Sequence, residues 1–253
     1  MLKNLLVYLL FIVCGLPALS QSSFLSSQSN YPILFSAFKS KEEGLKKQFE
    51  QAGLSWPAKQ LYIRSFKYDS QLEVWIRNDN QASFQLFKTY KICALSGALG
   101  PKRFEGDYQV PEGFYYINEL NPNSKYHLSL GINYPNLSDR VFSDSLNPGG
   151  DIYIHGTCAT VGCIPIQNDQ VEELYILSAF AQEQGQNFIP VHIFPVRFNQ
   201  EKNTKALNKA YDKSPDYEPF VDRLKAVYSY FELNKKLPLI SINNRGDYKI
   251  LSR

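Results

Sequence analysis

The feature that most constrains the fold is a strict alternation of apolar and polar residues early in the chain. Residues 72–77 place Leu, Val and Ile at every second position, with Glu, Trp and Arg between them. A period of two puts the aliphatic side chains on one face of a β-strand, whereas a helix would scatter them. The apolar run 61–66 precedes this strand, and the run 84–94 follows it after the turn-forming Asn-Asp-Asn at 78–80. The sequence therefore predicts an antiparallel hairpin arrangement here.

Similar patterns predict most of the remaining elements. Further strands are expected at 114–117, 126–134, 151–155, 191–198, 239–242 and 248–251. Helices are expected from a Ser40–Glu43 capping box to Gly53, from an Asp169–Glu172 capping pair to Gly185, over 204–211, and from Pro219 onward. Residues 21–35 are rich in Ser and Gln and are expected to be loose, and 96–113 form a glycine-containing ordered loop. We expect a mainly β, twisted-sheet α+β fold, which excludes a doubly wound nucleotide-binding fold.

Composition narrows the class of protein further. A chain of 253 residues that is 44% hydrophobic can bury a full core, so bulk disorder is excluded. With 27 Lys+Arg against 24 Asp+Glu, the formal charge of +3 predicts no nucleic-acid partner. No motif calls for a metal or another cofactor.

The N-terminus has the features of an export signal. Lys3 supplies a positive charge, 5–13 is an apolar run, and Ala18-Leu19-Ser20 suits cleavage before Gln21. We expect residues 1–20 to direct the chain to the periplasm or cell envelope, with membrane contact only through this segment. Lipidation of Cys14 or a retained anchor is the alternative. Cleavage leaves three cysteines, so at least one thiol has no intramolecular partner.

Those three include the densest group of reactive side chains in the sequence. His155 ends a predicted strand, and Cys158 and Cys163 follow within eight residues. An imidazole can take the proton of a thiol, and the thiolate can then attack a carbonyl carbon. The glycine before Cys163 permits a tight turn that aims backbone N–H groups at one point. A helix starting directly after Cys163 would also favour the thiolate through its dipole.

Three other interpretations of these residues stay open at this level. Cys158 and Cys163 can form a structural disulfide in an exported protein. His155, Cys158 and Cys163 can hold a zinc ion, although the spacing is unusual and a fourth ligand is missing. Both cysteines can also be inert buried residues. Cys93 is expected to be a buried strand residue, and His127 and His192 are expected to be structural.

The surrounding residues favour the nucleophile. Thr160, Gly162 and Cys163, with His155-Gly156 eight and seven positions before the cysteine, resemble the catalytic signature of the L,D-transpeptidase (YkuD-type) domain, and in particular its short-spaced branch of YafK-type murein enzymes. The resemblance spans 72–198 and includes Gly97, Gly100-Pro101-Lys102-Arg103, Gly106-Asp107, Gln109, 111–115, Tyr134-Pro135-Asn136, Gly149-Gly150, Gly185-Gln186 and Phe194-Pro195. It implies an L,D-transpeptidase-type catalytic domain at 59–199, a lead-in and helix at 21–58, and a helix–strand extension at 200–253 packed on the catalytic domain.

The resemblance also implies roles for individual residues. Cys163 matches the family's nucleophile, His155 its general base, and the Gly156 carbonyl a group that orients the imidazole. The backbone N–H groups of Val161, Gly162 and Cys163 are expected to form the oxyanion hole. Thr160, where the family usually has Ser, and the loop residues Lys102, Arg103 and Glu112 are expected to contact substrate. Cys158 receives no role beyond that of a bystander or a redox partner of Cys163.

The activity that this resemblance implies is acyl transfer on peptidoglycan stem peptides. An amine acceptor gives a cross-link or an attached protein, whereas water gives hydrolysis, including detachment of a wall-linked lipoprotein. The branch favours hydrolysis slightly. The rival interpretation is a non-catalytic cell-wall-binding module in which Cys158 and Cys163 form a disulfide and His155 is structural.

Overall fold

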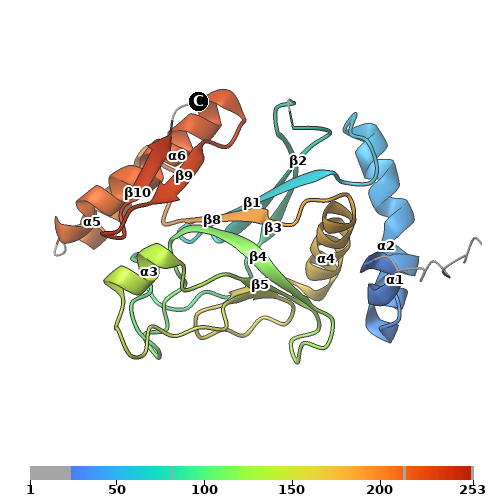
Figure 1. Cartoon of the computed structure of the whole chain (residues 1–253), viewed down its shortest axis with the longest axis horizontal. Coiled ribbons are helices and arrows are strands. Elements are labelled where there is room, and N and C mark those ends of the chain that lie inside the picture. Colours follow the sequence, from blue (N-terminus) through green and yellow to red (C-terminus); the bar gives the residue numbers. More distant parts are fainter. Residues whose placement is uncertain (1–23, 81, 213–214, 252–253) are drawn as a thin grey trace, which may run out of the picture.

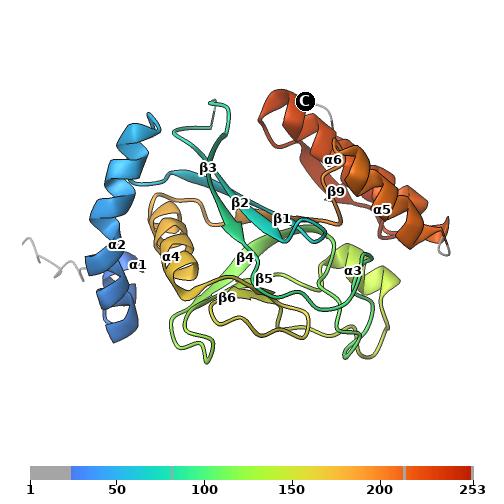
Figure 2. The same cartoon turned by 180° about the vertical axis from the view of Figure 1, so that it is seen from behind.

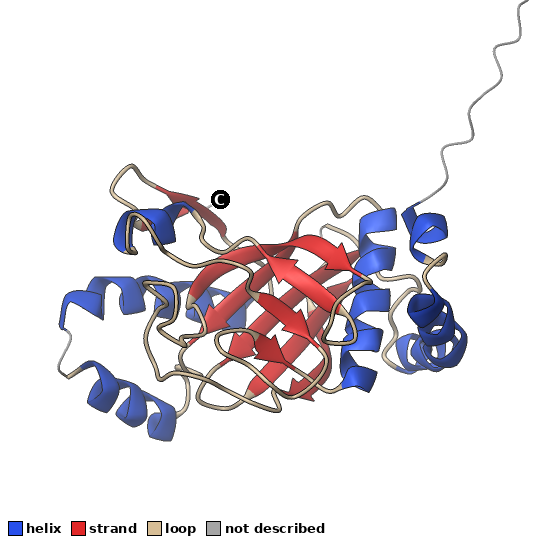
Figure 3. Cartoon of the chain, turned by 90° about the horizontal axis from the view of Figure 1, so that it is seen from below, coloured by secondary structure: helices blue, strands red, loops and turns tan. Residues whose placement is uncertain are grey.

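The core of the protein is one curled, mixed eight-stranded sheet. The computed structural model describes residues 24–80, 82–212 and 215–251. The strands of the sheet are β1 (Gln60–Phe66), β2 (Gln71–Arg77), β3 (Gln85–Lys91), β4 (Gly113–Asn121), β5 (Ser129–Ile132), β6 (Tyr153–His155), β7 (Ile164–Pro165) and β8 (Ile189–Phe194). Their order is β3-β2-β1-β8-β4-β5-β6-β7, with parallel pairing only for β1 with β8 and β6 with β7. Figures 1 and 3 show the strands of this sheet side by side, with helices around them.

The sheet curls until its two edges meet. β3 and β7 are the outermost strands in the order, yet Cys93, two residues after β3, donates its backbone N–H to Pro165 O of β7 at 3.0 Å. The predicted hairpin is confirmed, because β1 and β2 pair from Gln60 with Arg77 to Phe66 with Gln71. The mainly β architecture expected from the alternation is thus a half-barrel around one apolar interior.

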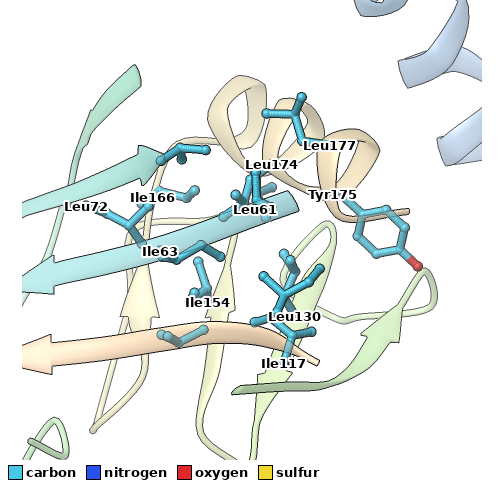
Figure 4. Packing of buried hydrophobic residues seen from close by; sticks show 14 of the residues in the cluster. Leu61, Ile63, Leu72, Ile117, Leu130, Ile154, Ile166, Leu174, Tyr175 and Leu177 are labelled. Atoms are coloured by element: carbon cyan, nitrogen blue, oxygen red, sulfur yellow. The ribbon is translucent and has the colours of Figure 1, made fainter. Parts of the chain in front are cut away.

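Helices cover one side of this sheet in two layers. They are α1 (Phe24–Gln28), α2 (Pro32–Gln51) and α4 (Asn168–Glu183). α4 lies on the strands and buries Leu174 and Leu177 among residues such as Leu61 (Figure 4). α2 packs outside α4, where the Phe38 ring meets Phe180 edge-on at 5.9 Å between centroids (Figure 2).

The C-terminal residues form a separate group of elements at the other end of the molecule. They are α5 (Glu201–Tyr211), the short 3₁₀ helix η1 (Pro215–Tyr217), α6 (Glu218–Asn234), and a hairpin of β9 (Leu239–Ile242) and β10 (Tyr248–Leu251). Leu224 and Tyr228 of α6 pack with Phe66 of β1 and Phe194 of β8 in one buried cluster. The helix–strand extension expected beyond residue 200 is therefore in contact with the sheet (Figures 1 and 2).

Several predicted boundaries are wrong at the N-terminal side. α2 begins at Pro32, and Ser40 lies inside it, where its hydroxyl donates to Ala37 O and makes no cap. The segment expected to be loose up to residue 35 instead holds α1 and the first turn of α2. Burial of Leu34 and Ala37 in the main core stabilises the start of α2 at Pro32. The polar composition of the segment gave no sign of this helix start.

Two elements near the candidate site were not predicted. α3 (Leu137–Phe142) begins at an Asn136–Asp139 capping box, and β7 separates Cys163 from α4. The capping pair of α4 is Gln167 and Gln170, whereas Asp169 binds Lys41 at 2.8 Å. Asp169, which the local pattern assigned to a helix cap, therefore forms a long-range ion pair with Lys41 instead.

The expected signal segment 1–20, with Cys14, lies outside the described residues. Of the helices that the structure does describe, none combines the length and apolarity needed to cross a membrane.

Candidate active site

Strand register brings His155 and Cys163 to the same face of the sheet. β6 and β7 pair in parallel, with Ile154 opposite Ile164 and His155 opposite Pro165. Ile154 and Ile164 are fully buried on the core face. Because side chains alternate along strands, His155 faces the opposite side. Cys163, one residue before β7, lies beside Tyr153, whose backbone N–H points at Sγ from 3.4 Å.

The environment of His155 sets its tautomer. The side chain is 2% exposed, and its ring lies 4.8 Å from the ring of Tyr126 between centroids. Nδ1 is 2.5 Å from Gly156 O, and a carbonyl can only accept, so Nδ1 carries the proton. This leaves the lone pair on Nε2. Burial lowers the pKa of His155, and the Gly156 carbonyl opposes part of that shift.

Gly156 is held in a space that admits no side chain. A Cβ at this position would lie 2.6 Å from Asn168 Oδ1 and 2.9 Å from the backbone oxygen of Tyr126. Asn168, the first residue of α4, also accepts a hydrogen bond from Thr157 N at 2.9 Å. The start of α4 therefore fixes the backbone that carries the histidine's carbonyl partner.

Cys163 carries a thiol whose surroundings favour the protonated form. Sγ is half-buried and donates to Asp151 O at 3.5 Å. Burial raises the pKa of the Cys163 thiol, while the Tyr153 N–H and the charge of Lys102 act in the opposite direction. The expected contribution of a helix dipole is wrong, because α4 starts five residues later, at Asn168. No hydrogen bond joins Sγ to the His155 imidazole among the residues that the structure describes.

The turn before Cys163 is held by Thr160. Its Oγ1 accepts from Gly162 N at 3.0 Å and donates to Cys163 O at 2.9 Å. Gly162 has φ of +146°, and a Cβ there would lie 3.1 Å from Gln109 O. Within the described part of the chain, the N–H groups of Val161 and Cys163 have no acceptor, whereas that of Gly162 is already used. Two of the three N–H groups expected to form the oxyanion hole are therefore free to donate a hydrogen bond to a ligand.

A disulfide links Cys93 to Cys158, with the two Cα atoms 5.4 Å apart, and leaves Cys163 as the free thiol. This overturns the Cys158–Cys163 bond considered above and removes Cys158 from a zinc trio with His155. Cys93 is half-buried beyond the end of β3 and is not the buried strand residue that was expected. A spacing of 65 residues gave no local signal, since only the curl of the sheet brings the two cysteines together.

Comparison with known proteins identifies the family of the catalytic domain. Residues 66–192 match the model of the L,D-transpeptidase catalytic domain, YkuD. YafK of Escherichia coli (strain K12), whose name assigns it provisionally to the L,D-transpeptidases, is 33% identical over 208 residues, which are 81% of this chain and 78% of YafK. This chain belongs to the L,D-transpeptidase catalytic-domain family.

Two solved structures are also similar. The helical cell shape determining protein Pgp2 from Campylobacter jejuni is 22% identical, with 73% of each chain covered and a TM-score of 0.43. Bd1075 from Bdellovibrio bacteriovorus is 19% identical over 74% of this chain and 78% of that one, with a TM-score of 0.40.

The loop residues expected to bind substrate in this L,D-transpeptidase domain occupy different environments. Lys102 is buried and binds Asp107 at 2.7 Å, and Glu112 is buried against Lys67 at 3.0 Å. Arg103 is partly exposed, and its guanidinium lies near three aromatic rings. Lys102 and Glu112 therefore hold the loop, while substrate contact by all three residues stays a prediction.

Sequence reasoning missed Tyr126 and Asn168, which support His155 and Gly156. An asparagine ahead of a helical pattern is a usable signal for Asn168, whereas Tyr126 has none. The other two histidines have structural partners: His127 Nε2 lies 2.7 Å from Glu172, and buried His192 bonds Tyr62 Oη at 2.8 Å. Burial lowers the pKa of His192 to about 3, so it stays neutral.

Proposed function

We propose that this protein is a cysteine acyltransferase or hydrolase that acts on peptidoglycan stem peptides. The observation that carries the proposal is the placement of a free thiol, Cys163, and a tautomer-locked imidazole, His155, on one face of adjacent strands. Membership of the L,D-transpeptidase family supplies the substrate class. Export to the periplasm through the segment 1–20 belongs to the same proposal.

The first half-reaction forms a thioester. Nε2 of His155 takes the thiol proton, and Sγ of Cys163 attacks the carbonyl carbon of the diamino acid at stem position three. The carbonyl oxygen becomes an oxyanion that accepts from the N–H groups of Val161 and Cys163. The intermediate collapses, and the imidazolium returns its proton to the departing amine. The Sγ–Nε2 contact forms in this proposal when substrate is bound, as is common for catalytic hydrogen bonds.

The second half-reaction decides between the two outcomes. His155 deprotonates either an amine or a water molecule, which attacks the thioester and releases Cys163. An amine yields a new amide bond, and water yields a free carboxylate. If the departing amine belongs to a wall-linked lipoprotein, the hydrolytic outcome detaches that protein.

The deciding experiment is mass analysis of muropeptides incubated with the mature protein, with and without an acceptor amine. We expect cleavage or exchange at the third stem residue, loss of at least about 10³-fold in the Cys163→Ala variant, and an adduct on Cys163 after treatment with a carbapenem. Full activity of Cys163→Ala on disaccharide-tetrapeptide would refute the nucleophile.

A non-catalytic wall-binding module remains the alternative, but its expected Cys158–Cys163 bond is replaced by Cys93–Cys158. Thiol labelling of protein isolated from the envelope distinguishes the two functions. Modification of Cys163 alone supports the enzyme, and complete protection of Cys163 supports the module.

A further inference from the structure

A cavity whose lining includes neither Cys163 nor His155 lies between the C-terminal elements and α3. Its volume is about 780 Å³. Its walls come from the start of α6, the β9–β10 hairpin, Phe142 of α3 and Arg103 of the 96–113 loop. Figures 1 and 2 show α3 beside the C-terminal elements in opposite views. The proposed acyl transfer uses none of these side chains except Arg103.

The cavity is positively charged. Four basic side chains line it, Arg103, Arg223, Arg245 and Lys249, against the acidic Asp216 and Asp247. Arg245 lies 3.7 Å from Asp247, whereas Arg223 and Lys249 have no ion-pair partner in the described part of the chain. The first turn of the 17-residue helix α6 also lines the cavity, with Pro219 and Phe220, and carries Glu218. The excess of basic side chains in the lining favours an anionic ligand.

Aromatic rings form the remaining wall. The Arg103 guanidinium lies 5.7 Å from the centroids of Phe142 and Tyr217 and 5.8 Å from that of Phe220. The Phe220 ring is 6.1 Å from Tyr248, at an interplanar angle of 35°. Flat rings beside guanidinium groups suit a ligand that has apolar ring faces and carboxylates together, as a sugar–peptide has.

One loop connects this cavity to the reactive cysteine. Lys102 packs against Gly149, two residues before Asp151, whose carbonyl accepts from Cys163 Sγ at 3.5 Å, and the next residue, Arg103, lines the cavity. The Arg103 carbonyl accepts from Asp144 N at 2.8 Å, which joins the loop to the segment after α3. A polymer bound in the cavity would therefore lie near a stem peptide held at Cys163.

We propose that this cavity binds a second disaccharide–peptide unit of the same peptidoglycan strand. Its sugar rings pack on Phe220 and on Phe142, which is exposed, and its peptide carboxylates meet Arg223 and Lys249. The inference rests on the proposed function for its ligand class. A second binding site of this kind lets the enzyme hold an insoluble polymer while it acts on one stem peptide. A short soluble substrate reaches only the Cys163 site and does not need the cavity.

The test compares two double variants of the mature protein. Arg223→Ala with Lys249→Ala removes both unpaired cations from the cavity, and Lys47→Ala with Lys91→Ala removes two exposed cations elsewhere. Co-sedimentation with protease-treated sacculi should weaken at least about tenfold for the first pair and less than about twofold for the second. Circular dichroism and thermal melting check that both variants fold.

Activity measurements separate this inference from the proposed function. With the cavity variant, turnover on soluble disaccharide-tetrapeptide should change less than about twofold, while turnover on sacculi falls at least about fivefold. Wild-type-like binding of the cavity variant to sacculi overturns the inference even if Cys163 proves catalytic. Loss of binding only with sacculi that still carry linked protein also overturns it, since the ligand is then an acidic protein. Absence of any Cys163-dependent turnover refutes the proposed function, and sacculus binding then tests the cavity alone.

Discussion

At the scale of residues, burial pushes both members of the Cys163–His155 pair toward their neutral forms. It raises the pKa of the thiol and lowers that of the imidazole. A neutral pair reacts by general-base transfer of the thiol proton, whereas a preformed thiolate–imidazolium pair would need the opposite shifts. In the proposed mechanism, substrate binding brings Sγ and Nε2 together and thereby activates the thiol.

The pH dependence of alkylation tests this state of the free enzyme. Because the folded-state pKa of Cys163 is raised, its reaction with iodoacetamide should increase with pH through a single transition above about 8.5. Because the pKa of His155 is lowered, the acid limb of kcat/KM should have its midpoint below about 6.5. His155→Ala should remove the acid limb and keep the alkylation transition. Rapid alkylation that is constant from pH 5 to 7 would contradict the neutral pair.

A methyl group on Gly156 should damage the site without touching either reactive side chain. In Gly156→Ala the new Cβ would collide with Asn168 and the Tyr126 carbonyl. We expect a loss of at least about tenfold in kcat/KM and about 1–3 kcal/mol in the free energy of unfolding. Gly44→Ala in α2 is the control, since a Cβ there meets nothing within 4 Å and should stabilise by about 0.4–1 kcal/mol. Equal behaviour of the two variants would contradict the close approach at Gly156.

At the scale of elements, the Cys93–Cys158 disulfide connects the end of β3 to the loop that precedes Cys163. The adjacent bond from Cys93 N to Pro165 O joins the same edges of the curled sheet. The disulfide and this hydrogen bond hold β7, which is only two residues long and forms few strand-pairing hydrogen bonds of its own. They therefore restrain the position of Cys163 relative to His155.

Removing the disulfide should lower stability more than removing the free thiol. Cys93→Ala with Cys158→Ala opens a loop of 65 residues and should lower the free energy of unfolding by about 2–5 kcal/mol. Cys163→Ala should change it by less than about 1 kcal/mol. Urea denaturation measures both values. Equal urea midpoints for the double variant and the wild type would show that the bond does not form in solution.

At the scale of the whole molecule, the C-terminal extension and the sheet share one buried boundary. Arg64 of β1 lies under α6, binding Glu73 at 2.6 Å and Glu232 at 2.6 Å. The Phe231 ring lies 4.9 Å from the rings of both Tyr62 and Trp75. Since a buried ion pair is costly to break, these contacts couple α6 to the strands.

A large-to-small change at this boundary should destabilise the entire fold. Phe231→Ala should cost about 3–5 kcal/mol, whereas Leu233→Ala on the exposed side of the same helix should cost less than about 0.5 kcal/mol. Thermal unfolding followed by circular dichroism and by tryptophan fluorescence should give one coincident transition. Two separate transitions in the wild type would show that the extension folds independently.

Most of the strands were predictable because their signals are local. The apolar run 61–66 and the alternation over 72–77 predicted β1 and β2, and the His155–Cys163 spacing with its glycines indicated the family signature. The early start of α2 and the existence of β7 were not predictable, since each depends on partners far along the chain.

The sequence by itself determined the alternation of β2 and the family signature around Cys163. Tertiary structure alone decided which cysteine stays free, because only the closing curl brings Cys93 to Cys158. It also decided that Lys102 and Glu112 are buried and that burial raises the pKa of the Cys163 thiol. Local patterns set backbone conformation over a few residues, whereas pairing and burial depend on which segments the folded sheet brings together.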